Sequence, residues 1–100
     1  MIVGTTPTHT FNIPFGTSII SRVRVVYSQN DEVVLTKTEK DCSFEDNILR
    51  VTLTQGDTFK FNHKHPVEIQ LRVLTASGSV LASVPKKIGV TKCLETEVIE

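Results

Sequence analysis

The three histidines are the first residues whose type and spacing could support chemistry. His63 and His65 lie two positions apart, so on a strand their side chains would share one face. Together with His9 they could chelate a metal ion if their loop approached the segment around His9. The loop also contains Lys64, and it offers no cysteine or acidic residue at ligand spacing. We therefore expect a solvated loop, with neither a metal ion nor another cofactor.

Carboxylates, serines and cysteines offer no better case for catalysis. No D-x-D-x-D-G calcium pattern occurs among the acidic residues, and aspartate is favoured in turns for its own reasons. The serines lack a G-x-S-x-G motif, and Cys42 has no identifiable histidine partner in the sequence. We expect turn and capping roles for Asp41, Glu45, Asp46 and Asp57. We also expect no enzymatic activity and no small-molecule substrate.

Charge and hydropathy exclude further classes of partner. Eleven basic and eleven acidic residues leave a formal net charge of zero, whereas phosphate binding needs a basic excess on one face. We therefore expect neither nucleic acid nor an anionic membrane as partner. There is no basic n-region, and no run approaches the roughly 20 apolar residues of a membrane span. We expect a soluble product of the cytoplasm, with Cys42 and Cys93 as free thiols because they match no metal or redox spacing.

Alternation of apolar and polar residues defines the elements that would position these groups. It is strict in Pro66–Thr75 and recurs in Ser21–Tyr27 and Ile48–Leu53. A strand turns alternate side chains to opposite faces, so each segment reads as a half-buried β-strand. Tyr27 falls on an inner row. The predicted core consists of Val23, Val25, Leu49, Val51, Leu53, Ile69, Leu71 and Val73.

The remaining segments complete an all-β chain. Turn residues separate further predicted strands at Thr8–Ile13, Ile19–Ser28, from Val33 onward, weakly at Thr58–Phe61, at Val80–Val84 and at Lys86–Val90. Phe44 is either a short strand residue or a plug in the core. About seven strands with short spacing predict an antiparallel two-sheet Ig-like β-sandwich, as a single domain over residues 1–100. The chain has no tryptophan and no cysteine pair at inter-sheet spacing, so "Ig-like" is the description it supports.

Two parts of the predicted surface are candidates for partner binding. Arg22 and Arg24, with Arg72 and Glu68, form the outer polar rows and would fix the register of an interface. The segments 1–7 and 92–100 are either flexible ends or partner-docking ends. The second of these places Leu94, Val98 and Ile99 at spacings compatible with one helical face, in a segment too small for its own core.

Four stretches carry a family resemblance: GTTPTHTFNIPF, RVRVVYSQND, VTLTQGDTFKF and VEIQLRVLTASGSVLAS. In this order and spacing they resemble small uncharacterised β-sandwich proteins encoded in phages and prophages of Firmicutes bacteria. The architecture is more distantly similar to the N-terminal β-domain of phage baseplate upper proteins, which attaches receptor-binding machinery to the tail. The resemblance covers most of the chain and implies a structural gene.

From this resemblance we expect a non-enzymatic structural or adaptor module of a phage or prophage particle, in the tail, the baseplate or the head. Its partners would be other phage structural proteins or further copies of itself. It would be made in the bacterial host cytoplasm and then join the virion. The alternatives are a carbohydrate- or receptor-binding sandwich and a host-directed inhibitor of a bacterial enzyme. The sequence offers no tryptophan platform for sugars, and its five phenylalanines fit a core better than a platform.

Overall fold

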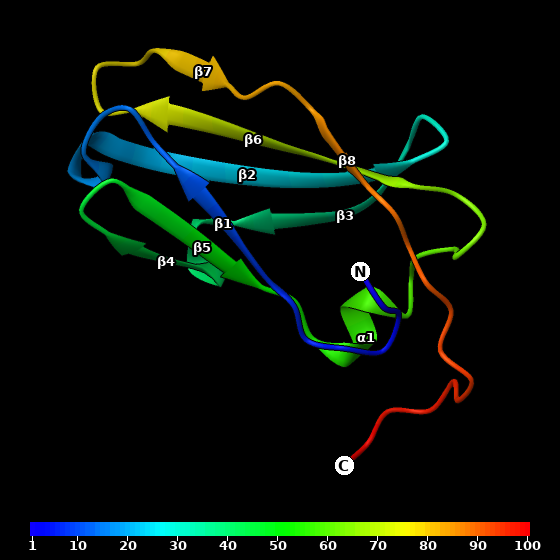
Figure 1. Cartoon of the computed structure of the whole chain (residues 1–100). Helices are drawn as coiled ribbons and strands as arrows, with labels where there is room; N and C mark the ends of the chain where they lie inside the picture. The colour runs from blue at the N-terminus through cyan, green and yellow to red at the C-terminus, as the bar shows by residue number, and fades with distance from the viewer.

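The chain folds into a two-layer β-sandwich, and its computed structural model describes residues 1–100 (Figure 1). Strands make up 48% of the residues. They are β1 (Thr8–Asn12), β2 (Ile20–Gln29), β3 (Glu32–Thr38), β4 (Cys42–Glu45), β5 (Ile48–Thr52), β6 (Val67–Thr75), β7 (Val80–Ala82) and β8 (Lys86–Ile88). The helical segments are two 3-10 turns, η1 (Thr17–Ile19) and η2 (Glu39–Asp41), and one short helix, α1 (Gln55–Thr58). The predicted all-β, antiparallel two-sheet fold is confirmed.

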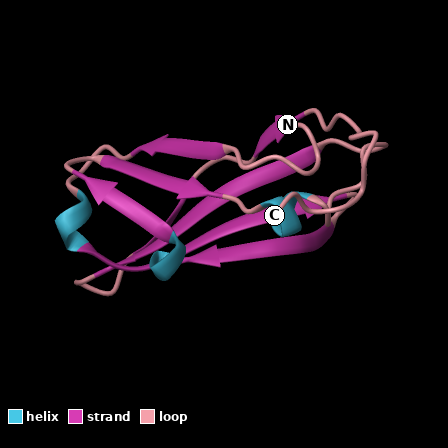
Figure 2. Cartoon of the chain, turned by 90° about the horizontal axis from the view of Figure 1, so that it is seen from below, coloured by secondary structure: helices cyan, strands magenta, loops and turns pink.

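The strand order is that of an immunoglobulin-like sandwich without its first strand. One sheet has the order β1-β5-β4, and the other has the order β3-β2-β6-β7, with β8 also paired to β6. Seen from below, the strands lie in two layers (Figure 2). These orders match strands B-E-D and C′-C-F-G of the immunoglobulin fold, in which a further strand A lies beside B. Here β1 pairs with β5 alone, so its other edge is free.

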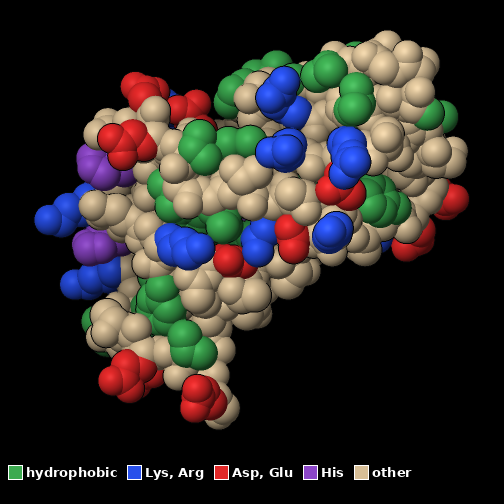
Figure 3. Space-filling model, turned by 180° about the vertical axis from the view of Figure 1, so that it is seen from behind, with side chains coloured by type: hydrophobic (Ala, Val, Ile, Leu, Met, Phe, Trp, Pro, Cys, Tyr) green, Lys and Arg blue, Asp and Glu red, His purple; other side chains and the backbone are tan.

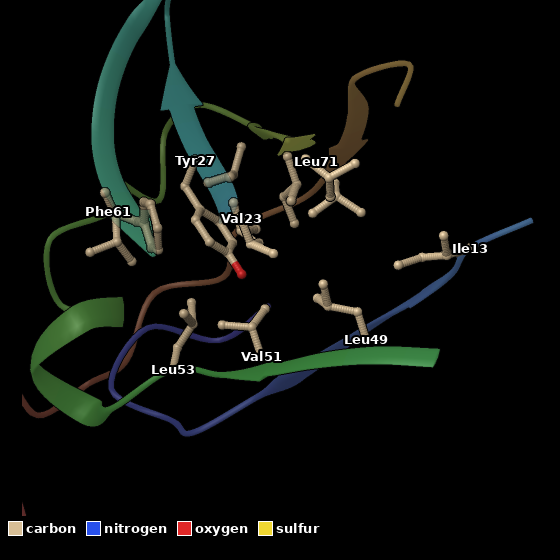
Figure 4. Close-up of a cluster of buried hydrophobic side chains, with 13 residues drawn as sticks. Ile13, Val23, Tyr27, Leu49, Val51, Leu53, Phe61 and Leu71 are labelled. Carbon is tan, nitrogen blue, oxygen red and sulfur yellow. The ribbon is translucent and has the colours of Figure 1, made fainter. Parts of the chain in front are cut away.

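The core lies between the two sheets and is built from the alternating inward residues. Figure 4 shows Leu49 and Val51 of β5 facing Val23 and Tyr27 of β2. Burying each such side chain contributes about 1.5–3 kcal/mol. Every residue predicted for the core is buried: Val23, Val25, Leu49, Val51, Leu53, Ile69, Leu71 and Val73, and Tyr27 with them. Ile13, Leu35, Phe61 and Val67 join the same cluster.

The β2–β3 hairpin forms at the predicted turn. Asn30 and Asp31 have φ angles of 51° and 64°, the left-handed region that asparagine and aspartate tolerate best among residues with a side chain. Two consecutive residues in this region give a turn whose twist matches that of the flanking strands. A local irregularity between Tyr27 and Ser28 then shifts the register of the pair.

The prediction of a strand at Thr58–Phe61 is wrong. Residues Gln55–Thr58 form α1, which begins with a capping box: the Asp57 N–H donates to Thr54 Oγ1, and the Thr54 N–H donates to Asp57 Oδ2. Two backbone donors at the start of the helix are satisfied in this way. Phe61 is buried as an individual plug and not as one of a strand's alternating residues.

Of the two alternatives predicted for Phe44, the structure shows the short strand: Phe44 lies in β4, an edge strand that brings the strand total to eight, and 41% of its surface is exposed. One further detail differs from the predicted elements. The strand after the Ala76–Ser79 turn ends at Ala82, two residues earlier than predicted, because Ser83 binds back to β6: its N–H donates to Leu71 O, and its Oγ accepts from the Leu71 N–H.

Residues 1–7 lie against the sandwich. Val3 is buried, its N–H donates to Thr91 O, and the Thr91 N–H donates to Met1 O. The Gly4 N–H donates to the hydroxyl of Thr58, which donates in turn to Thr5 O. The segment predicted as a flexible or partner-docking end thus bridges α1 and the segment that follows β8.

Candidate protein-interaction site

Arg22, Arg24 and Arg72 lie together on the outer face of the five-stranded sheet. Arg22 and Arg24 are on β2, and Arg72 of β6 is directly opposite Arg24. All three are exposed because the strand alternation turns them away from the core. They line a shallow hollow of about 290 Å³ together with Leu74 and Val80. The structure therefore brings the three predicted arginines into one site, which we call the arginine face.

No carboxylate forms an ion pair with the arginine face, although Glu39 Oε1 accepts a hydrogen bond of 3.3 Å from the Val23 N–H, between Arg22 and Arg24. The chain has two ion pairs, Lys37–Asp57 and Arg50–Glu45, and neither involves these arginines. Side chains directly opposite each other on paired strands have Cβ atoms about 4.5–5.5 Å apart, and like charges at this distance are destabilising. Figure 3 shows the molecule from behind, with Lys and Arg side chains next to hydrophobic ones across its middle and upper part and some Asp and Glu side chains among them. An acidic group from outside would relieve the repulsion.

Glu68, the acidic member of the predicted outer row, lies away from the arginine face. It is opposite Ser28 on β2 and Lys87 on β8, at the other end of β6. Its charge therefore adjoins a lysine and does not offset the Arg24–Arg72 pair.

The segment 92–100 forms neither a helix nor a strand, which corrects the helical face suggested by its spacing. Leu94 is 94% exposed, Val98 49% and Ile99 74%. The segment has one side-chain anchor: Gln55 Nε2 donates to Ile99 O, and the Ile99 N–H donates to Gln55 Oε1, at 3.0 and 2.9 Å. The structure does not bring these apolar residues to the arginine face of the same chain (Figure 1).

The three histidines do not come together. His9 is half-buried on β1, where its Nδ1 is 2.8 Å from Tyr27 Oη, and His63 and His65 are exposed in the loop after α1. No group of three His, Cys, Asp or Glu side chains has the arrangement of a metal site. Burial lowers the pKa of His9 and raises the pKa of Tyr27, so both stay neutral near pH 7. The pair is a hydrogen bond between the two sheets.

Asp41, Asp46 and Asp57 lie in caps and a turn as predicted, whereas Glu45 ends strand β4 and forms an ion pair with Arg50. Asp57 caps α1 and also forms an ion pair of 2.7 Å with Lys37 of β3. Burial alone would raise the pKa of Asp57, but hydrogen bonds from Lys37 and Thr54 outweigh it and leave that pKa below its ordinary value. Asp41 likewise caps η2, where the Thr38 N–H donates to its carboxylate. These contacts provide local structure and no paired catalytic carboxylates.

The cysteines are both free thiols in the structure. Cys42 lies at the start of β4, and its Sγ–H donates to Thr38 O at 3.3 Å. Burial and the nearby carboxylates of Asp41 and Glu39 raise the pKa of Cys42 to about 11. A thiol with this pKa is a poor nucleophile at neutral pH.

An apolar opening between β1 and β7 is a feature that the sequence reasoning missed. Nine residues line a hollow of about 280 Å³ there, and six of them are hydrophobic. The lining includes Phe15 beyond β1, Val73 on β6 and Leu81 on β7. Val80, Leu81 and Val84 are 57%, 44% and 86% exposed. Of these three residues only Leu81 lines the opening, and its apolar side chain in a strand too short to bury it was the available sequence signal.

No protein-family model matches the chain, and no curated protein matches its sequence. None of its helical segments is long and apolar enough to cross a lipid bilayer.

Proposed function

We propose that the chain is a non-enzymatic structural or adaptor module of a phage or prophage particle, and that it acts by forming protein–protein interfaces. The observation that carries the proposal is the arginine face, in which three exposed arginines adjoin Leu74 and Val80 and none of them forms an ion pair. Arginine beside apolar surface is the composition that protein interfaces favour. The particle setting comes from the family resemblance.

The chemistry of the arginine face specifies the partner. Guanidinium groups bind carboxylates with two parallel hydrogen bonds, so we expect an acidic surface on a neighbouring subunit. The zero net charge of the chain makes this attraction local to one face. Long-range steering by the whole molecule contributes little, because no overall charge is available for it.

The test has a genetic and a biochemical part. We expect the neighbouring genes to encode capsid, tail or baseplate proteins, and mass spectrometry of purified particles to find the chain among the components. The chain should also be retained when it is co-expressed with each neighbouring gene product and one of the two is immobilised. Arg24→Glu should weaken this retention about tenfold or more, because a charge facing an acidic partner changes sign.

Lys64→Glu is the matched control, since it makes the same charge change on an exposed loop residue away from the arginine face. It should leave retention unchanged, and both variants should keep the wild-type circular dichroism spectrum. Absence of the chain from purified particles, together with no retention by any neighbouring gene product, would overturn the proposal.

A further inference from the structure

The outer edge of β7 presents unpaired backbone groups. The Thr75 N–H donates to Ser79 O, and the Ser83 N–H donates to Leu71 O. In an antiparallel pair the residues that face the partner alternate, so the groups that face β6 belong to Ser79, Leu81 and Ser83. The N–H and C=O groups of Val80 and Ala82 therefore point away from the sheet, where β7 has no neighbour. Such an edge is a template for an added strand.

The inner side of this edge is apolar. Leu81 faces inward beside Val73 and lines the hollow with Ile13 and Phe15. Opposite lies β1, whose own free edge is the place where an immunoglobulin domain has its strand A. An added strand would thus place alternate side chains over the hollow and shield the exposed surface of Leu81.

The outer side of the same edge is basic. Arg72 lies opposite Ala82, so only a methyl group stands between the arginine and the next strand position. A long guanidinium side chain can reach across it. A strand that adds to β7 is therefore favoured if its outward residues are acidic and its inward residues are apolar.

The segment 92–100 of this chain has that pattern. Leu94, Thr96 and Val98 alternate with Glu95 and Glu97. With Thr96 opposite Leu81, the two glutamates are opposite Val80 and Ala82 whichever way the strand runs, and one of them adjoins Arg72. Leu94 and Val98 then point toward the hollow. The charge of one glutamate is thus complementary to Arg72, and two apolar side chains cover the hollow.

We infer that this segment of one copy adds to the β7 edge of a second copy. Its own chain cannot supply it, because β7 lies at the top of Figure 1 and the segment ends at the bottom. The contact joins two different surfaces, so each copy offers a donor segment at one end and an acceptor edge at the other. Repeated use gives a head-to-tail ring or filament. The inference rests on the proposed function, an interaction module, and names a second copy as one of its partners.

Sedimentation velocity over a range of concentrations tests this. Wild-type protein should form a series of oligomers that grows with concentration. Leu94→Asp/Val98→Asp removes the donor's apolar residues, and Ala82→Pro removes an edge N–H that does not bond to β6. Leu81→Lys is a second acceptor variant. Each variant alone should be monomeric, and a donor variant mixed with an acceptor variant should give one-to-one dimers and nothing larger.

Two further variants, with a control, test whether the segment 92–100 and Arg72 form the contact. Gln55→Ala releases the anchor of Ile99 and should strengthen association, because the donor segment is freed. Arg72→Glu should weaken it about tenfold at low salt, while Arg24→Glu, which lies farther from the edge, should leave it unchanged. Circular dichroism and the thermal midpoint verify the fold of every variant.

Wild-type protein that stays monomeric up to about 1 mM, the weak end of measurable affinities, would overturn the inference, and so would a donor–acceptor mixture that stays monomeric. These outcomes leave the proposed function intact if Arg24→Glu still weakens retention by a neighbouring gene product. If the oligomers form as expected but the chain is absent from particles, the particle role fails and the edge pairing stands.

Discussion

At the scale of single residues, the hydrogen bond between His9 and Tyr27 is a polar contact between the two sheets at the edge of the apolar cluster. Tyr27 is fully buried, and its ring also lies 5.8 Å from that of Phe61, centroid to centroid. Tyr27→Phe keeps the ring but leaves His9 Nδ1 without its partner. We expect a loss of about 1–3 kcal/mol, the cost of an unsatisfied buried polar group. Urea unfolding measures it, and an unchanged midpoint would show that water replaces the hydroxyl.

The Lys37–Asp57 pair gives a second residue-level prediction, on pH dependence. The pKa of folded Asp57 is lowered, so its contribution to stability is present above the ordinary carboxyl pKa and is lost as pH falls through the lowered value. Asp57→Asn removes both the ion pair and its titration. We expect this variant to be about 1–3 kcal/mol less stable at pH 7, because a charged hydrogen bond is lost.

The difference between wild type and Asp57→Asn should shrink as the pH is lowered from 7 to 3, since protonation of Asp57 removes the same interaction. Urea is the suitable denaturant, because a salt would screen the pair. His9 titrates identically in both proteins and cancels in the comparison. A difference that stays constant over this range would contradict the assignment of Asp57 as a stabilising charge.

At the scale of elements, the strands were predictable and the connections were only partly so. Val67 to Val73 alternate so strictly that one register buries all their apolar side chains, and the structure adopts it. The strand predicted at Thr58–Phe61 is wrong, because the weak alternation of Phe59 and Phe61 competes with a local signal for a helix start. That signal is the Thr54-x-x-Asp57 capping box. Asp57, for which a turn role is predicted, is itself the residue that marks the start of the helix.

The candidate site was likewise predictable only in part. Alternation alone placed Arg22, Arg24 and Arg72 on an outer face, and the pairing of β2 with β6 then brought them together. The opening between β1 and β7 could not be predicted, because it depends on which strands are edges. Edge position follows from sheet order, to which residues distant in the sequence contribute, and no local pattern encodes it.

Gly4 provides the prediction at this scale, because it joins the segment 1–7 to the sandwich. Its φ is +82°, and an added Cβ would lie 2.8 Å from the Phe59 ring. Gly4→Ala should therefore cost about 1–3 kcal/mol through backbone strain and the displaced ring. Gly89→Ala is the control. Gly89 lies in the segment that follows β8, which residues 1–7 contact, and it has no positive φ and open space around its Cβ position. Thermal unfolding that fails to separate the two variants would show that the segment 1–7 does not contribute to the folding unit.

At the scale of the whole molecule, the sandwich is elongated, with extents of 46 × 30 × 16 Å. Its arginine face is on a broad side, and its free β7 edge and the segment 92–100 are at opposite extremes of Figure 1. This separation lets one copy bind a partner through the broad side while the extremes join it to further copies. The two kinds of contact share Arg72 and Val80. Arg24→Glu should therefore leave association between copies unchanged, and variants in the segment 92–100 should leave retention by a neighbouring gene product unchanged.

Deleting Leu94 to Glu100 tests this division of roles. Leu94, Val98 and Ile99 are largely exposed, and Gln55 is the segment's only side-chain anchor to the sandwich. We expect the free energy of unfolding of the monomer, measured by its thermal midpoint at low concentration, to change by less than about 1 kcal/mol. The reason is that the deletion uncovers little apolar surface. The concentration-dependent oligomers seen by sedimentation should disappear. A deletion that unfolds the domain would place the segment in the core, and oligomers that persist would locate the contact between copies elsewhere on the surface.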